Sequence, residues 1–246
     1  MSAFFVSPDS ITKQTITVTG DLLVHLRDSL RVKVGALVLF GDGANQRYRT
    51  EITTVTNQAL TGRIIDVIAQ PVTHIPPLIL GQALLKGEKM DWVIQKATEL
   101  GISEIVPIES RHSVVQLKAG RVDHQLARWR RIALEAAQQS EQWRVPTIAV
   151  PQSLASLLIR CGNETMTCML VERQNGISLQ VLNLSNDDTR SVLVVIGPEG
   201  GWSQEEVEVA NQLGIVLITL GRHILRAETA AVASISILQS RLGQLG

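Results

Sequence analysis

The chain has few cysteines and no net charge. Its 246 residues include only Cys161 and Cys168, and 23 basic side chains balance 23 acidic ones. The two cysteines form no Cys-x-x-Cys pair, so we expect buried packing residues in a reducing compartment and no cysteine-rich metal site. The longest apolar runs stop well short of the roughly 20 residues that a membrane span requires, and the chain does not begin with a basic segment followed by an apolar one. We therefore expect a cytoplasmic protein.

Several common catalytic patterns are also missing. The five histidines show no His-x-x-x-His spacing, so no metal site is predicted. Neither the Gly-x-Ser-x-Gly turn of a hydrolase nucleophile nor the Gly-x-x-x-x-Gly-Lys loop of a triphosphate site is present. Metal-dependent hydrolysis, serine hydrolysis and triphosphate binding through such a loop are therefore not expected.

Charge is distributed unevenly along the chain. Residues 111–131 contain six basic side chains and one acid, whereas residues 187–212 contain six acids and one arginine. The basic segment has two interpretations, a face that attracts a polyanion or an ordinary solvated helix face. The basic residues are Arg111, Lys118, Arg121, Arg128, Arg130 and Arg131, and the acids are Asp187, Asp188, Glu199, Glu205, Glu206 and Glu208.

Residues 1–71 have the pattern of a small β domain. Short alternating runs over 15–19, 36–40, 49–55 and 60–65 are separated by Gly, Asp and Asn, which predicts an antiparallel sheet or barrel with one helix near 22–30. Basic side chains on its surface would suit RNA, namely Arg31, Lys33, Arg47, Arg49 and Arg63. Three prolines between 71 and 77 then mark a linker.

Residues 72–246 alternate between apolar strands and amphipathic helices. This alternation predicts a mostly parallel sheet between helices, and by pattern alone an open doubly wound one. The expected strands cover 78–84, 102–108, 147–150, 166–171, 192–196 and 215–220, and the expected helices cover 88–100, 126–140, 154–160, 203–213 and 228–242.

One stretch of this second region has the form strand, glycine turn, helix. The apolar strand 192–196 runs into Gly197-Pro-Glu-Gly-Gly201, and a helix follows with Ser203 as N-cap and Glu206 completing a capping box. Such a turn lies at the carboxyl end of a sheet strand, where open α/β sheets bind ligands, and its glycines let a ligand approach the backbone.

The residues of this turn narrow the choice of ligand. The spacing Gly-x-x-Gly-Gly does not match a dinucleotide fingerprint, and Glu199 would repel a pyrophosphate but tolerate a cationic ligand such as a sulfonium cofactor. A second glycine turn at Leu217–Gly221 and the segment Ile224–Ala230 would enclose one pocket with it if the two strand ends are neighbours. In that last segment, Arg226 and Glu228 are either pocket groups or a surface ion pair and helix cap.

These stretches resemble the ribosomal RNA small subunit methyltransferase E family of the SPOUT class. The resemblance is carried by Ile196-Gly-Pro-Glu-Gly-Gly-Trp-Ser-x-x-Glu206 and Leu220-Gly-x-x-Ile-Leu-Arg-x-Glu-Thr-Ala230, with shorter matches at His25, Leu30-Arg31, Lys86–Met90, Gln95–Gly101, Arg111–Val114 and Arg144–Pro146. It implies S-adenosylmethionine (SAM) as methyl donor and N3 of a uridine in small-subunit (16S) ribosomal RNA as acceptor. It further implies a PUA-like β-barrel first domain, a trefoil knot in the second domain, and a homodimer.

With uridine N3 as the acceptor that the resemblance implies, we hypothesise roles for single residues, because negative charge must be stabilised on the base when N3 loses its proton. Arg226 or Arg111 would donate to a uracil carbonyl, and Glu228 would orient the arginine or accept the proton. RNA would be held by His25, Arg31, Arg128 and Arg144. The cofactor would contact Ile196, Gly197, Pro198, Glu199, Gly200, Gly201, Leu217, Ile218, Leu220, Gly221, Ile224, Leu225, Arg226 and Thr229.

Two places depart from the family pattern. His223 stands where the family usually has an arginine, and Gln138 and Gln142 replace a usual glutamate and arginine. These changes leave open a non-catalytic RNA-binding or ribosome-assembly factor of the same fold, against which the intact cofactor turns argue. A nicotinamide-dependent oxidoreductase is disfavoured by the glycine spacing and by Glu199.

Overall fold

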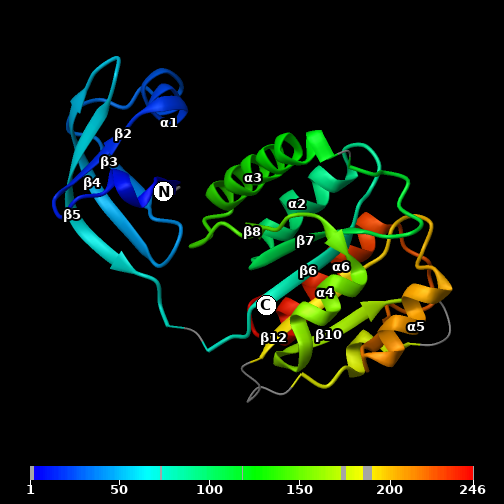
Figure 1. Cartoon of the computed structure of the whole chain (residues 1–246). Coiled ribbons are helices and arrows are strands. Elements are labelled where there is room, and N and C mark those ends of the chain that lie inside the picture. The colour runs from blue at the N-terminus through cyan, green and yellow to red at the C-terminus, as the bar shows by residue number, and fades with distance from the viewer. Residues whose placement is uncertain (1–2, 73, 118, 173–175, 185–189, 246) are drawn as a thin grey trace. The chain divides into compact units, whose positions relative to one another are not determined.

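The computed structural model describes residues 3–72, 74–117, 119–172, 176–184 and 190–245, and it divides into two compact units (Figure 1). The first unit comprises Met1–Val72 and Ala137–Val145, and the second comprises Thr73–Ala136 and Pro146–Gly246. Lys118, Asp187 and Asp188, which entered the predicted charge pattern, lie outside the described residues.

The first unit is built on a five-stranded sheet. The strand order is β1-β3-β4-β5-β2, with antiparallel pairs throughout except that β1 runs parallel to β3. The predicted antiparallel strands are therefore confirmed, whereas β1 was missed because three residues are too few to show an alternation. The elements are β1 (Ala3–Phe5), η1 (Pro8–Ser10), β2 (Thr15–Val18), α1 (Gly20–Val24), η2 (His25–Ser29), β3 (Leu37–Gly41), β4 (Gln46–Val55) and β5 (Leu60–Ala69).

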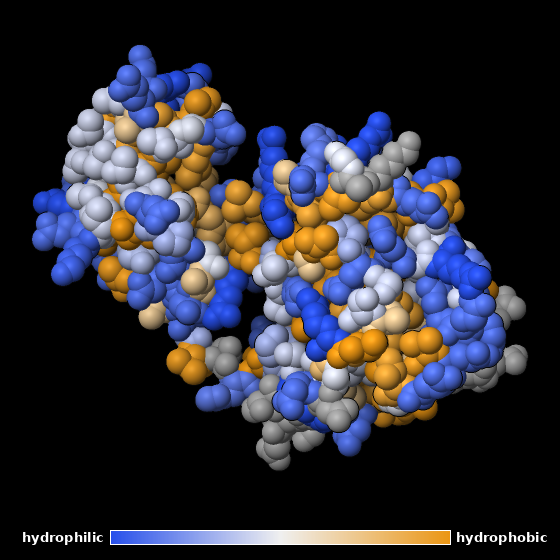
Figure 2. Space-filling model, in the orientation of Figure 1, coloured by the Kyte–Doolittle hydropathy of each residue, from blue (hydrophilic) through white to orange (hydrophobic). Residues whose placement is uncertain are grey.

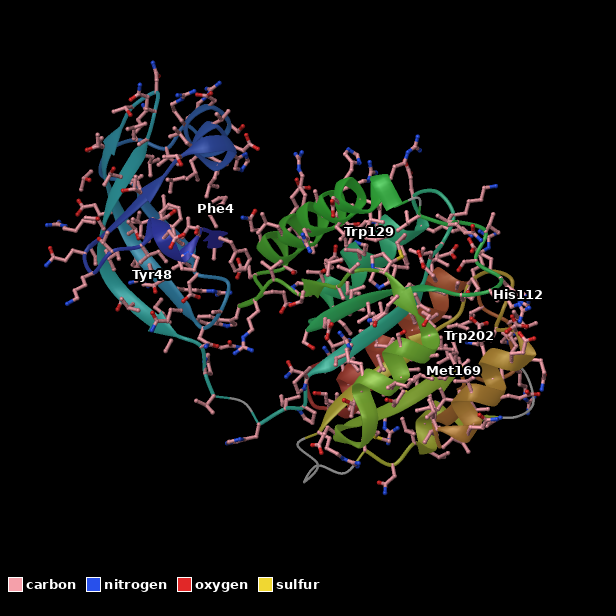
Figure 3. The ribbon with its side chains drawn as sticks, viewed as in Figure 1. Phe4, Tyr48, His112, Trp129, Met169 and Trp202 are labelled. Atoms are coloured by element: carbon pink, nitrogen blue, oxygen red, sulfur yellow. The ribbon has the colours of Figure 1, made fainter. Side chains whose placement is uncertain are left out.

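The side chains that alternate toward the interior form the core of this unit. Phe40, Ile52 and Leu60 are fully buried, and Leu26 covers them from the helical segment that was predicted near 22–30. Tyr48 belongs to the same cluster, and its hydroxyl donates to Gln46 Oε1 at 2.7 Å (Figure 3).

The segment Ala137–Val145 belongs to the first unit although it lies far from it in sequence. The guanidinium of Arg47 stacks 4.0 Å from the centroid of the Trp143 ring and donates to the carbonyl of Glu141 at 2.6 Å. Arg144 donates to the carbonyl of Ala44 at 2.8 Å and to the side-chain oxygen of Asn45. The sequence pattern predicted a single boundary, between residues 71 and 72, and so assigned this segment to the second domain. The contacts of Arg47 and Arg144 place it in the first unit instead.

The second unit contains an eight-stranded sheet in which every pair is parallel, as predicted. The order is β11-β13-β10-β12-β6-β7-β8, with β9 also paired to β7. The central strand β12 is buried on both faces, which explains its uninterrupted apolar sequence. The strands are β6 (Leu78–Ala83), β7 (Glu104–Glu109), β8 (Thr147–Ile148), β9 (Gln152–Ser153), β10 (Thr165–Leu170), β11 (Ile177–Ser178), β12 (Ser191–Ile196) and β13 (Val216–Thr219).

Helices cover both faces of this sheet, with α4 in front and α6 behind in Figure 1. Gly81 allows α4 to approach closely, because a Cβ at this position would lie 2.9 Å from Leu157 Cδ2. Both cysteines are buried, as predicted, and burial raises the pKa of the Cys168 thiol to about 12. No helix within the described ranges is both long and apolar enough to cross a membrane. The helical elements are α2 (Lys89–Glu99), η3 (Ala119–Arg121), α3 (Val122–Gln139), α4 (Leu154–Cys161), η4 (Gly162–Glu164), η5 (Leu179–Val181), α5 (Gln204–Gln212) and α6 (Ala227–Arg241).

Candidate active site

A pocket of about 640 Å³ lies at the carboxyl ends of β10, β12 and β13. Its size suits a small organic ligand, and its position is where parallel sheets bind them. Adjacent ends of β12 and β13 were a condition of the predicted pocket. In the structure β10 lies between them, so its end, Leu170–Glu172, also lines the pocket. The sequence did not indicate this third segment because no glycine turn marks it.

Most of the residues predicted to bind the cofactor line this pocket. The exceptions are Ile218 and Thr229, which are not among the lining residues of the described chain. Ile218 is fully buried because side chains alternate along β13, so its neighbours Leu217 and Thr219 face the pocket instead. Several lining residues were not predicted, namely Lys89, Leu170, Val171, Glu172, Trp202, Gln204, Val207, Thr219, Arg222, His223, Ala227 and Ala230.

The turn after β12 presents backbone at Gly197 and Gly200, because neither position has room for a side chain. A Cβ on Gly197 would lie 3.1 Å from the Trp202 ring, and one on Gly200 would lie 3.0 Å from the Cβ of His112. Trp202 is fixed in turn, since its Nε1 donates to the carbonyl of Leu170 at 2.9 Å (Figure 3). Gly201 adopts a φ of +70°, which L side chains rarely adopt.

The start of α5 is held by the predicted capping box. Ser203 Oγ accepts from the Glu206 amide at 3.2 Å, and Glu206 Oε2 accepts from the Ser203 amide at 2.8 Å. The other oxygen of Glu206 accepts from the backbone amide of Arg111 at 3.1 Å, and the Arg111 guanidinium pairs with Glu205. Arg111, one of the predicted catalytic residues, is therefore engaged with α5 and is not among the described residues that line the pocket.

Lys89 and Glu199 line the pocket and meet a third charged group, Glu228, which is not among the described residues that line it. Lys89 Nζ donates to Glu199 Oε1 at 2.9 Å and lies 3.7 Å from Glu228 Oε2. Glu199 Oε1 also accepts from the amide of Lys86 at 3.4 Å. Glu228 Oε2 is buried, and the described residues provide no hydrogen-bond partner for it. Glu199 is therefore already paired, whereas the sequence had suggested an uncompensated charge.

The protonation of this group follows from its contacts. The hydrogen bond to Glu199 raises the pKa of Lys89 above its ordinary value, so its ammonium stays protonated near neutral pH. Burial pushes the pKa of Glu199 upward, but the hydrogen bonds from Lys89 and from backbone amides outweigh it and leave this pKa below its ordinary value. The pair is therefore an ammonium and a carboxylate.

The second glycine turn forms the more open wall. Gly221 adopts a φ of +104° with open space around it, and Arg222 and His223 are exposed. Arg226 occupies the N-cap position of α6, where its carbonyl accepts from the Ala230 amide at 2.8 Å, but its side chain makes no capping hydrogen bond. The alternative that Arg226 serves as a side-chain cap therefore fails, and Arg226 is among the residues that line the pocket.

The residues predicted to contact RNA are all exposed. In the first unit, the His25 ring lies edge-on to Phe4 with centroids 6.0 Å apart, Arg31 has a φ of +53°, and Arg144 is engaged as described above. In the second unit, Arg128 Nη2 lies 2.5 Å from Asp91 Oδ2. Figure 2 shows hydrophilic residues along the outer side of α3, interleaved with apolar ones.

The sequence of this chain is similar to proteins of one known family. Residues 73–239 match the family described as RNA methyltransferase domain. A ribosomal RNA small subunit methyltransferase E of Mesomycoplasma hyopneumoniae is 34% identical over 189 residues, which cover 76% of this chain and 79% of that protein. The chain belongs to the ribosomal RNA small subunit methyltransferase E family.

Further similar proteins match nearly the full length of the chain. The Bacillus subtilis protein of the same name is 29% identical over 97% of this chain and 96% of its own length. A crystal structure of a ribosomal RNA small subunit methyltransferase E from Neisseria gonorrhoeae, bound to SAM, superposes with a TM-score of 0.86 at 26% identity and covers 98% of both chains. A methyltransferase of Legionella pneumophila in complex with SAM gives the same TM-score at 25% identity, with 97% of each chain covered.

Proposed function

We propose that this chain transfers a methyl group from SAM to N3 of a specific uridine in small-subunit (16S) ribosomal RNA. The observation that carries the proposal is the pocket at the ends of three parallel strands, where bare backbone, Lys89, Glu199 and Arg226 converge. The relatives from Neisseria gonorrhoeae and Legionella pneumophila are bound to SAM, which supports the cofactor assignment.

The residues of the pocket fit SAM. The turn Gly197–Gly201 and the segment Leu220–Arg226 would hold it by backbone groups, since glycines at the first turn exclude side chains from the contact surface. Glu172 provides an acidic side chain for a cationic ligand, whereas Glu199 is already paired with Lys89. When bound, the cofactor supplies an electrophilic methyl group on a sulfonium.

The chain's own residues would activate the nucleophile. Uridine N3 carries a proton and becomes nucleophilic only when that proton leaves, so the site must stabilise negative charge on N3 and on the flanking carbonyl oxygens. We assign this role to Arg226 or Arg111, with Glu228 as the carboxylate that orients the arginine or accepts the proton. The position of Arg226 on the pocket wall favours it, because Arg111 pairs with Glu205 instead.

The family also suggests the larger organisation. We propose that residues 1–71 act as a PUA-like β-barrel for RNA, using His25 and Arg31, and that residues 72–246 form a SPOUT domain with a trefoil knot around the cofactor site. Arg128 and Arg144 would add contacts to the RNA backbone, and two copies would form a homodimer in the cytoplasm. The five-stranded sheet of the first unit and the all-parallel sheet of the second support this division.

Methylation of authentic substrate tests the proposed function. Small ribosomal subunits from cells that lack this methyltransferase are incubated with the purified protein and methyl-labelled SAM, and the modified base is mapped by nuclease digestion and mass spectrometry. We expect a single labelled uridine carrying the methyl on N3. Label on another base or on another uridine atom would contradict the assignment, and SAM binding without any transfer would favour the non-catalytic assembly factor.

A further inference from the structure

Lys89 is a pocket-lining cation to which no sequence pattern assigned a role. It stands at the first position of α2, and its ammonium lies between a carboxylate from the turn after β12 and one from the first turn of α6. Three separate segments of the second unit therefore meet at one nitrogen atom. An ammonium has three donors, and the contacts to Glu199 and Glu228 occupy at most two of them.

The Lys89 ammonium is partly buried and is held in place by two neighbouring carboxylates. The Lys89 side chain is 36% exposed, and its partners Glu199 and Glu228 are 27% and 15% exposed. The two acids restrain the flexible lysine chain, and because Lys89 lines the pocket, an N–H that they do not use can serve a ligand there. A charge that is positioned before the reaction stabilises developing opposite charge without reorganisation at the moment of reaction.

We propose that Lys89 is a catalytic residue, whose ammonium donates to a uracil carbonyl oxygen and stabilises the negative charge that spreads to this oxygen as N3 loses its proton. This inference rests on the proposed function and adds to it a second cation beside Arg226. Arg111 is less suited to the task, because its guanidinium pairs with Glu205 on α5 and does not line the pocket in the described part of the chain.

The charges balance across the step. The N3–H bond breaks, its proton goes to a carboxylate, which we take to be Glu228, and the electron pair left on N3 forms the new bond to the methyl carbon. The bond between this carbon and sulfur breaks, and its electron pair stays on sulfur. One positive charge on sulfur and one negative charge on Glu228 disappear together, whereas the Lys89–Glu199 pair keeps its charges throughout. The stabilisation that Lys89 provides is therefore largest when negative charge has accumulated on the uracil ring. Stabilisation at that point lowers the activation barrier of methyl transfer.

Replacement of Lys89 by glutamine and by arginine tests the assignment. Glutamine keeps a donor for Glu199 but removes the charge, and arginine keeps the charge. With undermethylated small subunits and saturating SAM, we expect Lys89→Gln to slow single-turnover methyl transfer by about a hundredfold and Lys89→Arg to stay within about tenfold of the wild type. SAM affinity, measured by calorimetric titration, should change less than about threefold in both variants.

A more acidic substrate separates charge stabilisation from a merely structural role. Small subunits prepared with 5-fluorouridine carry an electron-withdrawing fluorine, so N3 loses its proton more easily and needs less help from Lys89. The deficit of Lys89→Gln should then shrink to about tenfold. Lys96→Gln is the matched control, because Lys96 lies on the same helix and pairs with Glu99 at 2.8 Å but does not line the pocket, so it should leave the rate unchanged on both substrates.

Several outcomes overturn the inference. An equal deficit on both substrates, a deficit explained by lost SAM affinity, or an unchanged rate in Lys89→Gln would each do so. If the glutamine variant does not fold, Lys89→Met against Lys89→Arg provides the same comparison. A wild-type protein that leaves the uridine unmethylated defeats the proposed function itself, whereas an active wild type with an equally active Lys89→Gln defeats only this inference.

Discussion

The two glycine turns of the pocket are built in different ways. The turn Gly197–Gly201 follows a strand that is buried on both faces, and it is fixed by Trp202, by Lys89 and by the close approach of His112. The segment Leu220–Arg226 follows the shorter strand β13 near the edge of the sheet, where Gly221 has open space around it and Ile224 is 52% exposed. One wall is therefore preformed and the other is open to solvent.

This difference separates two tasks of a binding site. A wall that is already ordered loses little conformational entropy when a ligand binds, so it suits the recognition of a small cofactor. An exposed wall with charged side chains such as Arg222 and Arg226 leaves room for a macromolecular substrate to reach the reacting atoms. Side-chain changes in the first wall should therefore affect SAM affinity, whereas side-chain changes in the second wall, which would hold SAM through backbone groups, should affect transfer.

The largest effect is expected from a side chain on the preformed wall. In Gly197→Val the new Cβ would press on the Trp202 ring, and the added methyl groups would occupy pocket space. Overpacking of this kind costs roughly 3 kcal/mol, which corresponds to a loss of about a hundredfold in SAM affinity by calorimetric titration. The matched control is Gly120→Ala, where a Cβ meets nothing within 4 Å and φ is not positive, so SAM affinity should be kept. Equal affinities in the two variants would show that the first wall does not hold the cofactor.

Arg226→Ala tests the open wall. We expect methyl transfer to fall by about a hundredfold at saturating SAM, because a donor to the developing charge is lost, while SAM affinity changes less than about threefold. Arg160→Ala is the control, since Arg160 is an exposed arginine on α4 that pairs with Glu104 at 3.1 Å. A variant at Arg226 that transfers methyl at the wild-type rate would remove it from the mechanism, and one that loses SAM instead would move it to the cofactor wall.

The hydrogen bond of Trp202 contributes to the order of the first wall. Trp202→Phe keeps a ring against Gly197 but leaves the Leu170 carbonyl without its donor, which should cost about 1–2 kcal/mol in the free energy of unfolding. Trp129 is the matched control, because its buried Nε1 has no hydrogen-bond partner among the described residues. Trp129→Phe removes this unpaired donor, so denaturant titration should find a smaller loss than in Trp202→Phe. A larger loss in Trp129→Phe would contradict the assignment.

The order of elements could be predicted from this sequence because local patterns determine it. The capping box of Ser203 and Glu206, the buried strand before it and the alternation of strands and helices are all local signals, and the structure confirms them. Strand order is not local, since β10 takes its place between β12 and β13 through side-chain packing that a single strand's sequence does not encode. The end of β10 was therefore missing from the predicted pocket.

Polar contacts between residues far apart in the sequence could not be predicted either. Lys89 lies 110 positions from Glu199, and no spacing rule connects a lysine at the start of one helix with a turn that far away. The family resemblance predicted an RNA contact for Arg144, and in the structure its guanidinium donates to Ala44 and Asn45 of the first unit. In both cases the residue type indicated a polar contact, but the contact partner could not be predicted from the sequence.

The smallest expected effect concerns the helix that follows the preformed turn. Ser203→Ala removes the acceptor for the Glu206 amide and should cost about 1 kcal/mol in the free energy of unfolding, as typical N-caps do. Ser153→Ala removes the corresponding acceptor at the start of α4, where Ser153 Oγ accepts from Ser156 at 3.2 Å, and should cost a similar amount. Only Ser203→Ala should also weaken SAM binding, by about twofold to threefold, because only α5 continues directly from the turn that holds the cofactor. Denaturant and calorimetric titrations of the two variants measure both quantities, and an equal loss of SAM affinity in Ser153→Ala would mean that global stability, not the order of the first wall, sets the affinity.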